Sequence, residues 1–336
     1  MPTLIGYLNH HVHHFTAHHP LYRSLIDNPP EGYRIVEGEE DRDSYPCWIP
    51  TCPTETKRKS FVFIEDWHTL FAAGNGQSRD FDIQGPLVQE KKSWLAQDNV
   101  LGIITHMRAT VADCVSLFGK ELAHKIHYVP LAFPPVKFTR PKSDKVRFLW
   151  TSSHGGAGQE SCWRLRGGPE TEKAFRLLGK PEKASLTIVG GPGDTRHLAE
   201  NDMHELYSNH DVFVVPSVRI HSVSVARALM YGMPVIVSDG WGYKEFLPVG
   251  SGAGFICHGQ WGLTCWHDKV FREDYSKMPV LFNPELANNV CGAMEVLLDR
   301  DRLEAMSHCA DMMGMVSFNI SERNRILKGI LDKELS

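Results

Sequence analysis

Apolar positions along the chain form short runs that alternate with segments of helical spacing. In the first half, β-branched or aromatic runs predict strands at 3–8, 33–37, 60–66, 100–106 and 125–133. Helices are predicted there at 21–27, within 79–97 and at 108–119, the last of which ends at Gly119.

The second half of the chain alternates more regularly. Predicted strands span 146–153, 184–191, 211–217 and 233–239, and predicted helices span 168–179, 201–210, 222–232, 284–298 and 301–313. Such alternation implies a parallel sheet covered on both faces, in which ligands bind beyond the carboxyl ends of the strands. We therefore predict an α/β fold with two Rossmann-like parallel-sheet domains that face each other across a cleft.

The chain length of 336 residues favours two domains rather than one. The segment 134–145, "PPVKFTRPKSDK", is rich in proline and charge, which is typical of a domain boundary. The predicted domains are an acceptor-side domain at 1–138 and a donor-binding domain at 139–315. A C-terminal helix at 316–336 is expected to pack back toward the N-terminal domain.

Composition narrows the class of protein. Lys and Arg number 36 against 40 Asp and Glu, and the resulting net charge of −4 gives no global attraction to nucleic acid or anionic membranes. No apolar run reaches the roughly 18 residues of a membrane span, and the N-terminus lacks the pattern of a signal peptide. Eight cysteines without paired spacing predict reduced thiols. We expect a cytoplasmic protein without an integral membrane segment; peripheral membrane contact is left open.

Loops after the second-half strands carry the chemical signal. The loop 151–168 combines Gly155 and Gly156 with Arg164 and Arg166. Glycine lets backbone N–H groups approach a ligand closely, and arginine binds phosphate with a fork of donors. The alternative is a glycine loop without a ligand. Gly190 and Gly191 give a weaker signal, because they could simply make a turn.

The segment 216–242 adds a helix N-terminus to these loops. Ser222 is placed to cap a helix that starts near Val223, whose free N–H groups and partial positive charge suit a diphosphate. The following strand ends in a second glycine turn at Gly242. Three turns are thus expected to converge on one anion-binding site.

At this point the second half resembles the donor-binding domain of retaining GT-B glycosyltransferases of family 4. The order "VVPS", Arg219–x7–Arg227, "ALMYGMPVIVSD" and "GWGYKE" is similar to that family, with arginine at both positions of its Glu–x7–Glu element. "RGGPETEKAF" resembles the family's "KG…A-F" helix, and "ASLTIVGGPGD" its "L-x-I-V-G-x-G-P" strand. The resemblance covers about residue 100 to the C-terminus.

The resemblance implies transfer of a sugar from a nucleotide-diphosphate sugar, with retention of configuration and without a metal or other cofactor. Arg166 takes the position of the family's lysine, and Glu245 matches a glutamate near the donor, its alternative role being to cap the next helix. In the first half, "VFIEDWHTLFA" resembles the "H-D-W-H-T" segment of starch and glycogen synthases. Glu65 takes the position of the first histidine, and His68 is the second.

The two arginines change the hydroxyl-binding chemistry of the motif. The family's glutamates accept hydrogen bonds from the donor sugar and the ribose, whereas a guanidinium group only donates. Arg219 and Arg227 either tune the site for a more anionic donor or acceptor, such as a uronic acid or phosphosugar, or mark loss of catalysis. A third interpretation places Arg227 on the solvent face of its helix, where it binds nothing.

A histidine-rich stretch follows the first predicted strand. Its residues His10, His11, His13 and His14 are expected to contact the acceptor or the transferred sugar. No carboxylate lies within the stretch, and no metal site is predicted. The acceptor is left open among glycans, lipids, proteins, small molecules and nucleic acids.

The predicted site residues form two further groups besides these histidines. Those predicted to act in catalysis are Arg166, Glu65, His68 and Arg219. Those predicted to bind the donor are Gly155, Gly156, Arg164, Gly190, Gly191, His221, Ser222, Val223, Ser224, Arg227, Gly242 and Glu245. Two other functions keep the same fold: a degenerate protein that binds a nucleotide sugar without turnover, and a nucleotide-sugar epimerase.

Overall fold

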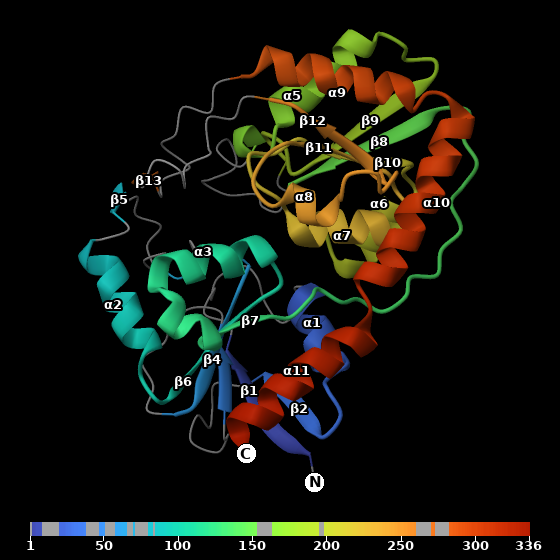
Figure 1. Cartoon of the computed structure of the whole chain (residues 1–336). Helices are drawn as coiled ribbons and strands as arrows, with labels where there is room; N and C mark the ends of the chain where they lie inside the picture. The colour runs from blue at the N-terminus through green and yellow to red at the C-terminus, as the bar shows by residue number, and fades with distance from the viewer. Residues whose placement is uncertain are drawn as a thin grey trace. The chain divides into compact units, whose positions relative to one another are not determined.

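Two compact units make up the chain (Figure 1). The first contains residues 1–134, 269–273 and 317–336, and the second contains 135–268 and 274–316. The computed structural model describes residues 2–8, 20–37, 47–50, 58–65, 70, 80–82, 85–152, 163–194, 198–259, 270–272 and 282–336. The sequence places the domain limits at 138 and 315, and the structure divides the chain after 134 and after 316.

The first unit is built on a six-stranded parallel sheet. Its strands, in spatial order, are β2 (Tyr33–Glu37), β1 (Thr3–Leu8), β3 (Cys47–Pro50), β4 (Ser60–Ile64), β6 (Val100–Thr105) and β7 (Ile126–Tyr128). Every residue of β4 and β6 is buried, as expected for strands whose two faces are both covered. The strand β3 was not predicted, although it lies between β1 and β4; its four residues are too few for a clear hydrophobic period.

Helices of the first unit are α1 (Pro20–Asp27), α2 (Pro86–Leu95), α3 (Arg108–Phe118), the 3₁₀ helix η2 (Lys120–Lys125) and α11 (Ile320–Leu335). The guanidinium of Arg323 on α11 is buried and donates to the carbonyls of Ser24 and Asn28 at 3.2 and 2.6 Å. A small antiparallel pair, β5 (Asp80–Asp82) with β13 (Val270–Arg272), also belongs to this unit. The sequence placed β13 within the donor-binding domain and did not predict the pair.

The second unit contains a five-stranded parallel sheet. Its strands, in spatial order, are β12 (Gly254–Cys257), β11 (Val235–Ser238), β10 (Val212–Val215), β8 (Val146–Thr151) and β9 (Ala184–Val189). Its helices are α5 (Gly168–Leu178), α6 (Glu200–Ser208), α7 (Ser222–Met230), α8 (Tyr243–Phe246), α9 (Pro284–Val296) and α10 (Arg300–Ser317).

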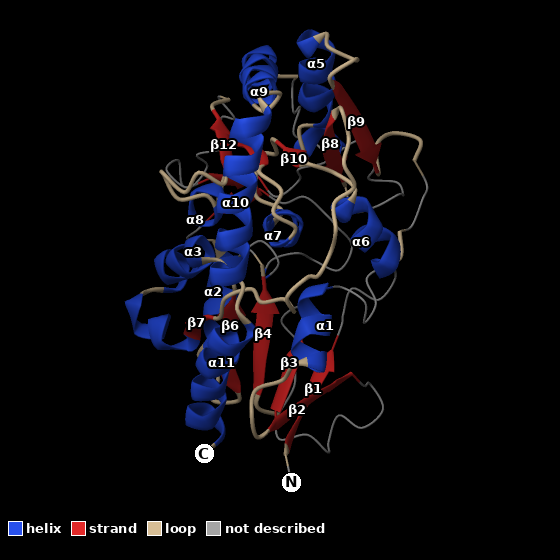
Figure 2. Cartoon of the chain, turned by 90° about the vertical axis from the view of Figure 1, so that its right-hand side faces the viewer, coloured by secondary structure: helices blue, strands red, loops and turns tan. Residues whose placement is uncertain are grey.

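The two faces of the second sheet are covered by different helices (Figure 2). Val212 and Val214 of β10 belong to the core that α5 and α9 close from one side. Phe213 points the other way, and its ring packs on Tyr207 of α6, 5.7 Å between centroids. Successive β10 residues thus face opposite layers, as the period of a strand requires.

Candidate functional site

Three loops meet at the carboxyl edge of the second sheet and are joined by backbone hydrogen bonds. The N–H of Val218 donates to the carbonyl of Leu165 at 3.0 Å, and the N–H of Trp241 donates to that of Val218 at 3.1 Å. The N–H of Ile220 donates to the carbonyl of Trp241 at 2.9 Å. We call the segments 163–168, 216–222 and 238–242 together the three-loop site.

Two glycines allow the close approach of backbones at this edge. Gly167 has φ +65°, and a Cβ there would lie 2.3 Å from the carbonyl oxygen of Pro216. Gly190 has φ +77°, and a Cβ there would lie 2.3 Å from the carbonyl oxygen of Ser152. No other residue could occupy either position without displacing the neighbouring backbone.

Buried hydroxyl groups fix the loop that follows β10. The hydroxyls of Ser217 and Tyr243 lie 2.5 Å apart, and Tyr243 also donates to the carbonyl of Val215 at 2.9 Å. Ser238 donates to the carbonyl of Ser217. All three side chains have no exposed surface, so this end of the site is rigid.

Arg166 and Arg227 both act electrostatically on one buried tyrosine. Arg166 is 8% exposed, and its carbonyl accepts a 3.1 Å bond from Trp150 Nε1. Arg227 is half-buried, with its Cζ 5.7 Å from the centre of the Tyr207 ring, within range of a cation–π contact. Arg227 therefore contacts the Tyr207 ring, unlike the interpretation in which it lies on the solvent face of its helix and binds nothing.

Tyr207 is a site residue that the sequence did not indicate. Its side chain has no exposed surface, and its hydroxyl lies near the hydroxyls of Thr151 and Ser224. Burial raises the pKa of Tyr207, opposed by Arg227, by the hydroxyls of Thr151 and Ser224 and by Arg166. Tyr207 lies in a helix that was predicted, but its proximity to Arg227 depends on packing across the layer.

The N-cap of α7 lies one residue before the predicted cap. His221 is the N-cap, and its carbonyl accepts the first helical bond, from Val225 N–H at 3.0 Å. Ser222 is the first helical residue and is fully buried, so its predicted role as cap is wrong. The first-turn N–H groups, including those of Val223 and Ser224, have no acceptor within the helix, as at any helix N-terminus.

Arg219, Gly242 and Glu245 lie in or beside the three-loop site. Arg219 is half-buried and forms an isolated parallel bridge with Trp241. Gly242 has φ +87° and is the N-cap of α8. Glu245 is the third residue of that one-turn helix, a position from which a side chain can reach the N-cap backbone, so its alternative role as a cap stays a prediction.

In the first unit, Glu65 directly follows β4, and its backbone carbonyl accepts two hydrogen bonds from threonine hydroxyls. Thr105 and Thr110 donate to that oxygen at 3.1 and 2.8 Å. The Glu65 carboxylate lies 3.9 Å from Nε2 of His106, which is 2% exposed and stacks on Phe63. His106 ends the neighbouring strand, and its position beside Glu65 was not foreseen from the sequence.

Several predicted site residues lie outside the described residues: Gly155, Gly156, His68, His10, His11, His13 and His14. Among the side chains that the structure describes, no group of three or more His, Cys, Asp or Glu could hold a metal ion. No described helix is long and apolar enough to cross a bilayer.

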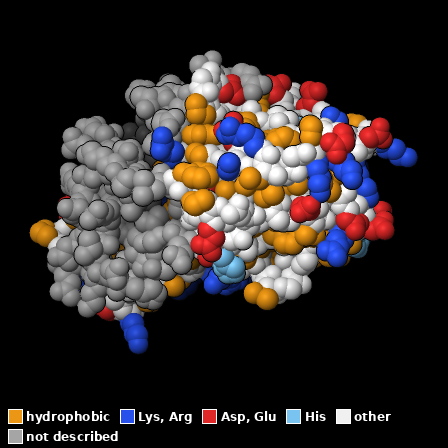
Figure 3. Space-filling view, turned by 90° about the horizontal axis from the view of Figure 1, so that it is seen from above, with side chains coloured by type: hydrophobic (Ala, Val, Ile, Leu, Met, Phe, Trp, Pro, Cys, Tyr) orange, Lys and Arg blue, Asp and Glu red, His pale blue; other side chains and the backbone are white. Residues whose placement is uncertain are grey.

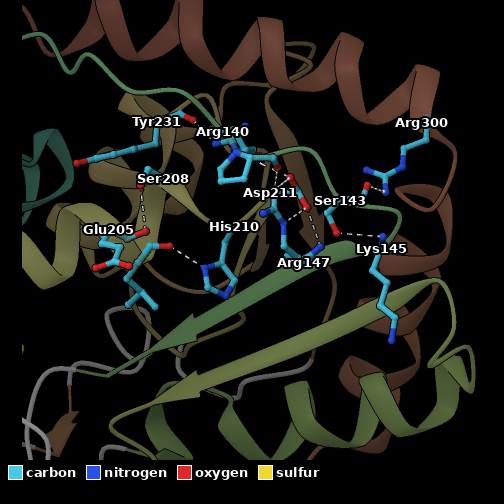
Figure 4. A network of polar contacts seen from close by, with 12 residues as sticks. Arg140, Ser143, Lys145, Arg147, Glu205, Ser208, His210, Asp211, Tyr231 and Arg300 are labelled. Carbon is cyan, nitrogen blue, oxygen red and sulfur yellow. Dashed lines mark hydrogen bonds and ion pairs between the residues drawn. The ribbon is translucent and has the colours of Figure 1, made fainter.

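The amino edge of the second sheet carries a different polar network (Figure 4). Asp211, before β10, accepts from Arg147 of β8 through both carboxylate oxygens, Nε at 3.0 Å and Nη2 at 2.8 Å. Arg140 donates to the carbonyl of Tyr231 at 2.5 Å, and its Nε lies 3.9 Å from Asp211. His210 bonds the Leu206 carbonyl at 2.6 Å.

Comparison with known proteins gives matches among solved structures. No protein-family model and no curated protein matches the sequence. HepE from Anabaena, in complex with UDP and glucose, is 10% identical with TM-score 0.64, over 99% of this chain and 100% of that one. A glycosyltransferase from Rickettsia africae is 10% identical with TM-score 0.61, over 100% and 99%. The chain has the GT-B fold.

A third similar structure matches a smaller share of both chains. Sucrose-phosphate synthase from Thermosynechococcus elongatus is 14% identical with TM-score 0.58, over 87% of this chain and 74% of that one. The predicted fold class, α/β with two Rossmann-like parallel-sheet domains, is confirmed. At these identities the likeness concerns the fold alone.

Proposed function

We propose that this protein is a glycosyltransferase that transfers a sugar from a nucleotide-diphosphate sugar to an acceptor. The observation that carries the proposal is the three-loop site, where a buried arginine and the N-terminus of α7 lie on joined loops at the carboxyl edge of a Rossmann-like sheet. Ligands of open α/β sheets bind at that edge, and helix N-termini suit phosphate groups. The UDP bound to HepE makes UDP-sugars the first donors to test.

The proposed transfer depends on stabilising the leaving diphosphate. Negative charge grows on the diphosphate as its bond to the anomeric carbon breaks, so donors fixed in advance lower the barrier. Arg166 and the first-turn N–H groups of α7 are proposed to supply such donors, and Arg219 belongs to the loop that leads into α7. Retention of configuration and independence from metal ions complete the proposal.

We assign different roles to the two arginines of the Arg–x7–Arg element. Arg219 belongs to the loop of the site and is proposed to contact an anionic group of the donor or acceptor. Arg227 lies over the ring of Tyr207 and is proposed to be a positioning residue, holding the layer beneath the site. Neither guanidinium can accept a hydrogen bond from a diol.

A thermal-shift screen against UDP-, GDP-, ADP- and dTDP-sugars tests donor binding. A ligand at one hundred times its Kd adds about 2.7 kcal/mol of stability, so a specific donor raises Tm by several degrees. The screen is run with and without EDTA, and equal shifts support binding without a metal. If no nucleotide sugar changes Tm, the proposed function is wrong.

A second candidate is a protein that binds a nucleotide sugar without transferring it. The observation that favours it is the presence of arginine at both positions of the motif. Slow hydrolysis of the bound donor separates the two functions, because a catalytic site releases free nucleotide even without an acceptor. Binding with no release of nucleotide would assign the non-catalytic function.

A further inference from the structure

A cavity lies beside the N-terminal half of α5, in the second unit, and shares Trp163 and Arg164 with the segment 163–168. Its volume is about 490 Å³, within the range of small-molecule sites. The lining residues that matter here are Trp163, Arg164, Glu170, Lys173, Arg176 and Phe282. We call this cavity the α5 pocket. The face over α5 and α9 mixes hydrophobic, basic and acidic side chains (Figure 3).

The α5 pocket lies on the other side of segment 163–168 from Tyr207. Trp163 and Arg164 line the pocket together with residues of α5, which covers one face of the sheet. Arg166 acts on Tyr207, whose ring packs against the opposite face. Arg164, predicted to bind the donor, therefore belongs to a cavity with its own lining.

Glu170 supplies the polar feature that points to a ligand. Its side chain is 1% exposed, and Oε1 accepts the N–H of Asn283 at 2.8 Å. Oε2 is buried and has no hydrogen-bond partner among the described residues. A buried carboxyl oxygen without a partner is costly, and a ligand hydroxyl or amine would satisfy it.

Charge and aromatic surface define the rest of the ligand. Three basic side chains, Arg164, Lys173 and Arg176, line the pocket against two acidic ones, Glu170 and Glu172. Glu172 pairs with Arg176 at 2.9 Å, and the anionic group of a ligand is therefore placed against Arg164 and Lys173. An anionic group on the ligand is therefore favoured.

Phe282 provides an apolar platform at the rim of the pocket. Its side chain is 44% exposed, whereas Trp163 is 8% exposed and packs edge-on against Trp150 at 4.7 Å between centroids. The C–H face of a sugar ring stacks on such an exposed aromatic ring, while its hydroxyl groups donate to carboxylates.

We propose that the α5 pocket binds a saccharide that carries a carboxylate or phosphate group. A hydroxyl of the sugar donates to Oε2 of Glu170, the ring stacks on Phe282, and the anionic group lies against Arg164 and Lys173. This ligand is distinct from the nucleotide sugar of the three-loop site, and its binding does not depend on turnover.

Calorimetric titration of the full chain tests the proposal with four probes. Hyaluronan tetrasaccharide supplies a carboxylate, glucose 6-phosphate a phosphate, chitotetraose a neutral control and UMP a nucleotide. At least one acidic saccharide should bind about tenfold more tightly than chitotetraose, because a charged hydrogen bond contributes about that factor. If neither acidic saccharide binds below about 5 mM, or chitotetraose binds equally well, the proposal is wrong.

Two variants assign the binding to this pocket. Glu170→Gln keeps the acceptor for Asn283 and removes the carboxylate, and Phe282→Ala removes the platform; each should weaken acidic-saccharide binding about tenfold. Leu177→Ala on the same helix, 46% exposed, is the matched control and should change nothing. Unchanged affinity in both variants overturns the proposal. A second result also overturns the proposal: UMP binds, Glu170→Gln weakens that binding, and Arg166→Met does not. The ligand of the α5 pocket would then be a nucleotide.

Discussion

The two edges of the second sheet use their polar groups in opposite ways. At the amino edge, Asp211 receives two bonds from the guanidinium of Arg147, and a third from the N–H of the same residue at 2.8 Å. At the carboxyl edge, the first-turn N–H groups of α7 have no acceptor within the helix, and the loop that leads into α7 is hydrogen-bonded to the loop that carries Arg166. The carboxylate of Asp211 is thus saturated within the fold, whereas the N–H groups at the start of α7 are available to a ligand.

Topology explains why the edges differ. In a parallel sheet with crossover helices, every helix N-terminus lies near the carboxyl edge, and its N–H groups point away from the helix. The amino edge receives the helix C-termini and the segment 140–145, which Arg147 and Arg300 hold through the carbonyls of Pro141 and Ser143 at 2.9 and 2.8 Å.

The largest expected effect is on stability, at the amino edge. Asp211→Ala leaves the Arg147 guanidinium without its carboxylate in a site where Asp211 is 6% exposed. Breaking a buried pair costs about 3–5 kcal/mol, so the urea midpoint should fall strongly while donor affinity of the folded protein stays the same. The exposed pair Lys180–Glu295, 2.6 Å apart, is the control, and Glu295→Ala should change the midpoint little. Equal midpoint changes would show that the network contributes no special stability.

The next effect is on turnover, at the carboxyl edge. Arg166→Met keeps the length of the side chain and removes its charge. Loss of one preorganised donor to a leaving oxyanion lowers kcat about 100- to 1,000-fold. Initial rates with a saturating donor measure it, and Arg302→Met on α10, where the side chain is 65% exposed, is the control. A change of less than about threefold in kcat would exclude Arg166 from the charge-stabilising role.

A smaller effect on stability is expected from the glycine turn after β9. Gly190→Ala combines a positive φ with a clash against the carbonyl of Ser152 and should cost about 1–3 kcal/mol. Gly193→Ala has φ +80° but open space around the added methyl group, so it isolates the backbone strain. The urea midpoint of Gly190→Ala should therefore be lower than that of Gly193→Ala. The reverse order would contradict the close approach described here.

The smallest effects are on the pH dependence of stability, and they have opposite signs. Burial raises the pKa of Glu170 above 4.5, so its ionisation opposes folding, and stability falls as pH rises from 4.5 through the folded pKa. Burial lowers the pKa of His210 below 6.5, so its contribution is lost as pH falls from 6.5 through the folded pKa. Relative to wild type, Glu170→Gln should therefore become more stable toward about pH 8, and His210→Gln toward about pH 5. Parallel profiles for wild type and both variants would contradict these assignments.

Local patterns along the chain predicted the sheets but not the contacts between layers. Four of the five strands of the second sheet and the glycine turns at Gly190 and Gly242 follow from hydrophobic runs and residue type, whereas the strand β12 was not predicted. Tyr207 and Glu170 were missed, because each lies in a predicted helix and only packing shows that its polar atom is buried. The N-cap of α7 was misplaced since serine is a frequent cap, whereas here Ser222 is drawn into the core.

Hydrogen–deuterium exchange with and without the best nucleotide sugar from the screen tests the central claim most directly. Donor binding at the carboxyl edge predicts slower exchange in 163–168, 190–191 and 216–224, and unchanged exchange in 140–147 and 209–211. Arg166→Met should weaken that protection, and Asp211→Asn should leave it intact. Protection at the amino edge, or none at the three-loop site with a donor that raises Tm, would contradict the account.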